Sequence, residues 1–319
     1  MPRYRRLALA LALLASFAAP LAHASAHASV CPADPGHAPT GDLTATRVSA
    51  ARVDDSEERL YEGPVWRDGA LYLSDFVHNG TFPSRIRRFS PPDRWETVVE
   101  DSGSNGLTLD LDGDLLAATH DRKQIARVRL EDGTRTPLVS TFDGLPFNSP
   151  NDLVMGADGS LYFTDPDYQR KAAPGGQPLT RVYRHHQGVT TVVDDSLRNP
   201  NGIALSPDGD TLYVAGGTGD GDVLRTYPLR EGVPGAGRDL ARITGGDGLT
   251  LDCLGNIYVT EHGQQRVRVF SPAGEVLATI HVDANITNAA FGGDDRRTLF
   301  LTGAASLWSI ELPVAGLPY

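Results

Sequence analysis

The chain has 319 residues, 40% of them hydrophobic, and its 40 Asp and Glu residues outnumber its 29 Lys and Arg residues to give a formal net charge of −11. An acidic balance of this size disfavours nucleic acids and anionic membrane surfaces as partners, because both attract basic proteins. The length by itself allows one domain or two.

Residues 1–24 have the pattern of a secretory signal peptide. A basic start at residues 3–6 precedes an apolar run over 7–19, which is too short to span a bilayer. The Ala-His-Ala sequence at 22–24 provides a cleavage site of the small-x-small type. We therefore expect an exported protein, periplasmic or secreted, with no membrane attachment after cleavage.

Residues 25–43 are rich in Ala, Pro, Gly and Asp, a composition that predicts a disordered linker ahead of a folded domain at 44–319. The two cysteines of the chain are Cys31, in this segment, and Cys253. Export would permit a disulfide between them. Two unpaired thiols are the alternative that the sequence leaves open.

One hairpin pattern recurs six times. In its clearest copy, residues 151–165, a polar residue leads a short apolar segment, a turn follows at 157–160, and a second β-type segment completes the unit. The copies start about 45 residues apart, which is typical of a β-propeller blade of four strands. The six leading residues are Glu62, Asn105, Asn151, Asn201, Asp247 and Asn288. The sequence therefore predicts one all-β domain, a six-bladed β-propeller with four antiparallel strands per blade.

The last copy of the pattern, which starts at Asn288, is one strand short of a full blade. The segment Thr44–Val53 alternates in polarity and precedes the first copy, so it has no blade of its own. We expect it to complete the last blade, because this would close the ring and remove a free sheet edge. The longest insertion, at 168–180, is expected to be a mobile loop at the channel mouth.

The leading residues predict a metal site. Innermost strands line the central channel of a propeller, so equivalent positions form a ring. All six leading residues carry a side-chain oxygen, which suits one divalent cation, calcium first, with zinc, magnesium and manganese as alternatives. The competing explanation is that Asn and Asp cap the turn into each strand. Glu62 argues against it, because Glu is a poor turn former.

A second set of polar residues falls about 14 positions after the leading residues, where the returning strand reaches the same face. It contains His120 and His262, and Asp75, Asp165 and Glu261 lie close to the equivalent point. These groups are candidates for acid–base chemistry or substrate binding. For each histidine the alternative is a surface or turn position without a role in chemistry.

Five motifs in register carry a family resemblance: EGPVW from Glu62, SPNDL from Ser149, PNGIALSPDG from Pro200, DGLTLD from Asp247 and TNAAFGG from Thr287. With them the chain resembles the senescence-marker-protein/gluconolactonase (regucalcin-like) family of six-bladed propellers, over roughly residues 55–312. Each motif is weak alone, and their common order and spacing make the resemblance specific.

The resemblance implies a single divalent ion held by Glu62, Asn201 and Asp247, with Asn151 at the position that contacts the substrate and, in some members, the metal. It also implies that Asp247 is the catalytic acid or base. Ser149 differs from the arginine that members related to the animal protein carry at this point, which leaves the substrate open. The substrate-binding candidates are Asn105, His120, Asn151, Asp152, His262 and Asn288.

The leading functional hypothesis is an exported, metal-dependent lactonase that opens a sugar lactone by water attack. The ion would stabilise the charge that develops on the carbonyl oxygen, and Asp247 or a histidine would take the proton of the water. One alternative is a phosphotriesterase-like hydrolase on the same calcium site, like diisopropylfluorophosphatase. The other is a non-catalytic, ligand-binding propeller in which calcium is only structural.

Overall fold

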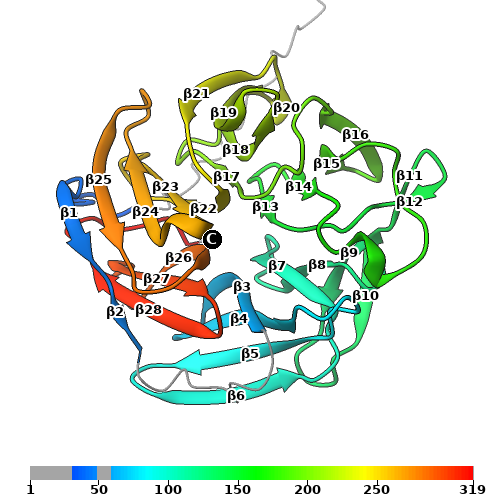
Figure 1. Cartoon of the computed structure of the whole chain (residues 1–319), viewed down its shortest axis with the longest axis horizontal. Helices are drawn as coiled ribbons and strands as arrows, with labels where there is room; N and C mark the ends of the chain where they lie inside the picture. The colour runs from blue at the N-terminus through cyan, green and yellow to red at the C-terminus, as the bar shows by residue number, and fades with distance from the viewer. Residues whose placement is uncertain (1–30, 49–58, 319) are drawn as a thin grey trace, which may run out of the picture.

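The structure is a computed structural model that describes residues 31–48 and 59–318. Six β-sheets are arranged around a central axis, and the first strand of each lies nearest that axis (Figure 1). The predicted six-bladed propeller is therefore confirmed. The proposed signal peptide lies outside the described residues.

Each blade is a meander of antiparallel strands. Blades one and two contain β3 (Arg59–Arg67), β4 (Ala70–Val77), β5 (Ser84–Ser90), β6 (Arg94–Val99), β7 (Ser104–Leu109), β8 (Leu115–Thr119), β9 (Gln124–Val128) and β10 (Arg135–Val139). Blades three and four contain β13 (Leu153–Met155), β14 (Leu161–Asp165), β15 (Arg181–His186), β16 (Val189–Asp194), β17 (Ile203–Leu205), β18 (Thr211–Thr218), β19 (Gly221–Arg230) and β21 (Arg238–Arg242). A short strand, β20 (Val233–Pro234), pairs with the end of β19.

Blades five and six follow the same plan. They contain β22 (Gly246–Leu251), β23 (Ile257–Glu261), β24 (Arg266–Phe270), β25 (Val276–His281), β26 (Ile286–Gly292), β27 (Thr298–Gly303) and β28 (Ser306–Glu311). A two-stranded hairpin, β11 (Thr141–Phe142) and β12 (Leu145–Pro146), connects blades two and three. No helix in the described part of the chain is long and apolar enough to cross a membrane.

The hydrophobic core lies between the blades. Every residue of β4 is buried, because both faces of an inner strand pack against neighbouring blades. Val65 and Ile86 of blade one, for example, belong to one cluster with Leu107 and Leu115 of blade two. Six such clusters occur among the described residues, one for each contact between successive blades. This continuous packing explains why the chain forms one domain.

The ring is closed as the sequence predicted. Strand β2 (Thr46–Arg47) pairs antiparallel with β28, and Thr46 lies opposite Ser309. The amide of Val48 extends this pairing by donating to the carbonyl oxygen of Leu307 at 2.7 Å. The rest of the predicted strand, residues 49–53, lies outside the described residues.

The segment expected to be a disordered linker is instead docked on the propeller over its described part. Cys31 forms a disulfide with Cys253 in the turn between β22 and β23. Strand β1 (Gly41–Thr44) pairs in parallel with β25, which gives blade five a fifth strand. The prediction was wrong here because the backbone groups of this segment find partners in the fold, which composition alone cannot show.

The insertion at 168–180 is likewise anchored rather than free. Lys123 donates from Nζ to the carbonyl oxygens of Asn148 and Arg170, at 2.5 and 2.9 Å. Gln177 donates to carbonyl oxygens of the β11–β12 hairpin. The short 3-10 helix η2 (Arg170–Ala172) lies within this insertion. These contacts fix the insertion against blades two and three.

Candidate active site

The leading residues are directed to the axis by irregularities in the innermost strands. The pairing of β3 with β4 shifts register between Glu62 and Val65, and β22 shows the same shift across Asp247. The pairings of β7 and β26 shift across Asn105 and Asn288. Asn151 precedes β13 and Asn201 precedes β17. A bulge changes the direction of a side chain, so these bulges turn the leading residues of four blades away from the packed blade faces.

Glycines after the leading residues allow neighbouring blades to meet at the axis. The amide of Gly106 donates to the carbonyl oxygen of Asn151 at 2.7 Å, and Gly202 donates to Asp247 at 2.9 Å. A Cβ atom at Gly202 would lie 2.5 Å from that same Asp247 oxygen. Only glycine permits such a close approach of two backbones. The motifs Asn-Gly and Asp-Gly therefore bring the oxygens of separate blades together.

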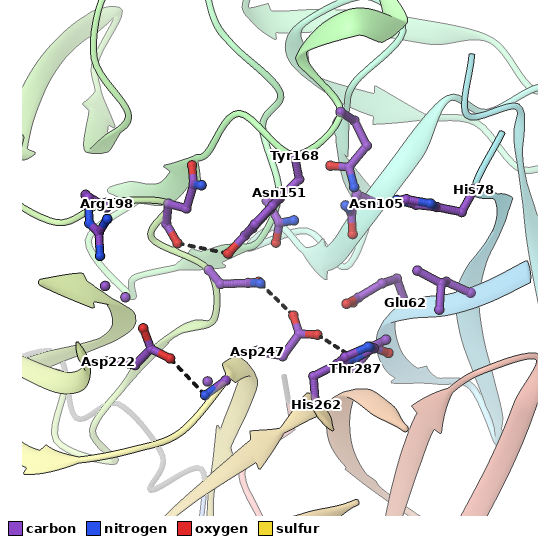
Figure 2. Close-up of a pocket in the computed structure, with 18 of the residues that line it drawn as sticks. Glu62, His78, Asn105, Asn151, Tyr168, Arg198, Asp222, Asp247, His262 and Thr287 are labelled. Atoms are coloured by element: carbon purple, nitrogen blue, oxygen red, sulfur yellow. Dashed lines mark hydrogen bonds and ion pairs between the residues drawn. The ribbon is translucent and has the colours of Figure 1, made fainter. Parts of the chain in front are cut away.

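A cavity of about 470 Å³ opens at this end of the axis. Glu62, Asn105, Asn151, Asn201 and Asp247 all line it, and Figure 2 shows Glu62, Asn105, Asn151 and Asp247 around its centre. The volume suits a small molecule. Five of the six leading residues thus lie together, as the repeat predicted.

The walls of the cavity differ in chemistry. Leu60, Phe76 and His78, from the blade-one hairpin and the residue after it, form one part. Arg198 and Asp222, from the segments around blade four, lie on the other side of the view in Figure 2. A bound molecule would therefore meet an apolar and aromatic surface on one side and charged groups on the other.

Asp247 is held by two neighbours. Asn201 donates from Nδ2 to Oδ1 of Asp247 at 2.6 Å, and His262 places Nδ1 3.4 Å from Oδ2. The hydrogen bond to Asp247 raises the pKa of His262, against the effect of burial. Burial raises the pKa of Asp247, although the hydrogen bonds from His262 and Asn201 oppose the shift. His262 is the first residue of the 3-10 helix η3 (His262–Gln264), which follows β23.

Glu62 is buried close to other carboxylates. Its Oε2 accepts hydrogen bonds from the amide of Gly63 at 2.6 Å and from Nδ2 of Asn288 at 3.1 Å. Burial, followed by the nearby carboxylates of Asp247 and Asp152, raises the pKa of Glu62 well above its ordinary value. Carboxylates crowded in this way repel one another unless a positive charge is bound between them.

The residues at the cavity floor fit a hard divalent cation. Among the described residues, the amide oxygens Oδ1 of Asn105 and Asn201 are buried without a hydrogen-bond partner. Such orphaned oxygens are rare in folded proteins and indicate an unfilled ligand role. No group of three or more His, Cys, Asp or Glu in the described part of the chain could hold a metal ion, so the carboxylates of Glu62 and Asp247 need amide oxygens to complete a site.

Three predicted substrate-binding residues do not line this cavity. His120 is fully buried below it, with Nε2 2.7 Å from the carbonyl oxygen of Phe82 and its ring packed edge-on against Phe76. Burial lowers the pKa of His120. Asp152 and Asn288 line a separate cavity of about 20 Å³. His120 follows β8, Asp152 precedes β13 and Asn288 lies within β26. Their positions in the repeat do not determine which way their side chains point.

The three acidic residues expected on the same face are structural. Asp75 lies 3.1 Å from Arg59 and 2.8 Å from Arg85 in ion pairs. Glu261 pairs with Arg266 at 2.6 Å. Asp165 accepts backbone hydrogen bonds from residues 148 and 149, and burial raises its pKa to about 7. All three carboxylates are fully buried within blade structure, so they are not part of the cavity.

Several cavity residues were missed. Arg198 and Asn199 lie three and two residues before Asn201, whereas the equivalent residues before Asn151, Asn148 and Ser149, do not line the cavity, so the repeat did not identify them. His78 and Asp222 carried no signal either, since they lie beside connections between strands. Ser149 donates from Oγ to the carbonyl oxygen of Pro166 and accepts from the amide of Gln169. It therefore supports the cavity residue Gln169 rather than lining the cavity itself.

A six-bladed propeller with an oxygen-lined axial cavity defines the class of this protein. The sequence pattern of the SMP-30/Gluconolactonase/LRE-like region matches residues 60–305. The chain belongs to this family.

Three proteins illustrate the similarity. A gluconolactonase of Zymomonas mobilis subsp. mobilis is 27% identical, over 82% of this chain and 81% of that protein. A 6-deoxy-6-sulfogluconolactonase of Pseudomonas putida is 30% identical, over 79% of this chain and 86% of that protein. The solved structure of a gluconolactonase from Xanthomonas campestris is 28% identical with a TM-score of 0.72, and the alignment covers 89% of this chain and 100% of that one.

Proposed function

We propose that this protein is a lactonase that opens a sugar lactone with the help of one divalent cation. The observation that carries the proposal is the convergence of Glu62, Asn201 and Asp247 at the floor of a 470 Å³ cavity. The lactonase relatives support the reaction class. The orphaned Oδ1 of Asn201 supports the cation, and that of Asn105 is free to accept a hydrogen bond from a substrate hydroxyl group.

Glu62, Asn201 and Asp247 would hold the cation, with Asn151 as a further oxygen donor. When bound, the cation would supply Lewis-acid stabilisation of the negative charge that develops on the carbonyl oxygen of the lactone. The oxygen donors favour calcium over zinc, which binds mainly nitrogen and sulfur ligands in proteins. Magnesium and manganese remain alternatives. Neutral asparagines suit this site because they add donors without cancelling the cation's charge.

Asp247 is the residue we propose as the general base. Its Oδ1 is oriented by the amide of Asn201, and its Oδ2 faces His262. Oδ2 would accept the proton of the attacking water, and His262, on the same side of the cavity, would stabilise the carboxylate orientation. Asn105 and Asn151 would bind the hydroxyl groups of a sugar lactone, since amides both donate and accept hydrogen bonds.

We further propose that the protein acts after export. The N-terminal pattern of residues 1–24 supports this, and so does the Cys31–Cys253 disulfide, because disulfides persist mainly in oxidising compartments. The mature protein would be periplasmic or secreted.

A paired substrate screen tests the function. Purified protein is treated with EDTA, reconstituted with calcium, and assayed with δ-gluconolactone in a weakly buffered pH-indicator assay, with a phosphotriester in parallel. We expect lactone opening that disappears on chelation and returns with calcium. Turnover of the phosphotriester alone would support the phosphotriesterase alternative. Calcium binding without turnover of either substrate would favour a non-catalytic ligand-binding propeller.

A further inference from the structure

The residues directly after the leading residues form a second ring of equivalent positions in the six blades. Its members are Gly63, Gly106, Asp152, Gly202, Gly248 and Ala289. Five of these are glycine or alanine, as the close approach of neighbouring blades requires. Asp152 is the exception. It places a carboxylate that is only 6% exposed in a ring that otherwise has almost no side chains.

Asp152 is joined to the cation site through one amide group. Asn288 donates from Nδ2 to Oδ2 of Asp152 at 3.4 Å and to Oε2 of Glu62 at 3.1 Å. The other end of the same amide, Oδ1, accepts the backbone amide of Ala289 at 2.8 Å. That contact decides which end of the Asn288 amide faces the two carboxylates. Asp152 is fixed in turn by the amide of Leu153, which donates to its Oδ1 at 3.0 Å.

The space for this arrangement comes from the small members of the ring. A Cβ atom at Gly248 would lie 2.0 Å from Cγ of Asn288, and one at Gly106 would lie 2.9 Å from Oδ1 of Asp152. The cavity that Asp152 and Asn288 line holds about 20 Å³, far too little for a sugar lactone. This small cavity therefore offers no room for a substrate beside these two side chains.

We propose that Asn288 and Asp152 are positioning residues that hold the Glu62 carboxylate in its cation-binding orientation. The inference rests on the proposed cation site and deepens it. Without Asn288, the hydrogen bond from the Gly63 amide would be left to orient the Glu62 carboxylate, which could then rotate toward water. Groups that hydrogen-bond to metal ligands commonly change metal affinity by about 10- to 100-fold when they are removed.

The test uses the full-length mature protein with calcium as the probe. Asp152→Gly installs the residue that the ring carries in most other blades, and Asn288→Ala removes the bridging amide. Isothermal titration calorimetry of EDTA-treated protein should show calcium binding weakened about 10- to 100-fold in each variant. In the double variant, the loss of calcium-binding free energy should be smaller than the sum of the losses in the two single variants, because both residues act through one hydrogen-bonded chain. Thr108→Val, in the same small cavity but outside this chain, should bind calcium like the wild type.

Thermal unfolding separates positioning from a merely structural role. The metal-free Asp152→Gly protein should melt at or above the wild-type temperature, because a crowded carboxylate has been removed. The increase in its melting temperature on addition of calcium should be smaller than that of the wild type. Equal melting losses with and without calcium, or calcium binding as tight as in the wild type, would overturn the inference while leaving the lactonase proposal intact. Absence of divalent-cation binding by the wild type would overturn the cation site and this inference together.

Discussion

The oxygen-bearing residues at the axis are not required by the propeller fold itself, and they are what indicates a function. Blades one and five supply carboxylates at Glu62 and Asp247, whereas blades two, three and four supply amides that reach the same cavity. The amides add oxygen donors without adding negative charge, while the two carboxylates supply the charge that attracts a divalent cation. At this scale the function depends on a few atoms rather than on the blade scaffold.

Neutralising either carboxylate should abolish activity without unfolding the protein. We expect Glu62→Gln and Asp247→Asn to lower lactone turnover by at least about 100-fold, because charge stabilisation at the reacting oxygen is lost. Steady-state kinetics and calcium titration measure the effect, and circular dichroism monitors the fold. Asp112→Asn, at an exposed turn position, is the matched control. Wild-type turnover in either carboxylate variant would refute the assignment.

Gly248 should be intolerant of even one extra carbon. Gly248→Ala would drive Cβ into the Asn288 side chain, and we expect it to cost about 1–3 kcal/mol of stability through overpacking and to weaken calcium binding. Gly219→Ala is the control, since a Cβ atom there meets nothing within 4 Å. Urea unfolding compares the two variants. Equal stability of both variants would contradict the prediction, because it would mean that the packing around Gly248 adjusts to the extra methyl group.

Blades adhere mainly through apolar clusters, but one polar junction joins blades three and four. Asp194 at the end of β16 accepts hydrogen bonds from Tyr227 at 2.6 Å and from Arg225 at 3.0 Å, both on β19. Burial alone would raise the pKa of Asp194, but hydrogen bonds from Tyr227, Ser196 and Arg225 outweigh it and lower the pKa below its usual value. The ionised carboxylate is therefore part of the interface.

This junction predicts an acid-sensitive contribution to stability. Because the folded pKa lies below the unfolded value of about 3.9, the contribution is complete above that pH and is lost as pH falls through the folded value. We expect Asp194→Asn to cost about 2–3 kcal/mol at pH 7. The difference between the variant and the wild type in free energy of unfolding should become smaller below about pH 4. Urea unfolding across this range measures both proteins, and a constant difference would contradict the assignment.

The propeller ring is closed by the N-terminal segment, which also pairs with the C-terminal segment. The N-terminal segment contributes β2 to blade six and β1 to blade five, and the backbone near Pro313 and Ala315 pairs with residues 35–37. The Cys31–Cys253 disulfide joins positions separated by 222 residues. The N-terminal segment is therefore attached to blade five, to blade six and to the C-terminal segment.

Removing the disulfide should loosen this closure without affecting chemistry. We expect Cys31→Ser to lower the free energy of unfolding by about 2–5 kcal/mol, because the unfolded chain regains the conformational freedom that the disulfide removes. Turnover at 25 °C should persist, since Cys253 does not line the cavity. Thermal unfolding of Cys31→Ser, Cys253→Ser and the double variant should give one common melting temperature. A further loss in the double variant would mean that the thiols act separately.

Much of this architecture was accessible from local pattern. The spacing of Glu62, Asn105, Asn151, Asn201, Asp247 and Asn288 predicted six blades and placed five of these residues in one cavity. The pattern could not show that His120, Asp152 and Asn288 lie outside the lining of this cavity, because position in the repeat specifies neither the rotamer nor the twist of each blade. It also treated residues 25–43 as a linker, since composition does not reveal backbone partners that lie far away in the chain.

The sequence by itself determined the repeat, the fold class, the ring of oxygen-bearing residues and the family, because each depends on residue type and short-range spacing. Only the tertiary structure decided which oxygens face the cavity, that Asp152 lines a separate small cavity, and that Cys31 reaches Cys253. Those outcomes depend on bulges, glycine-sized gaps and contacts between distant segments. Such features exist only once the blades have closed around a common axis.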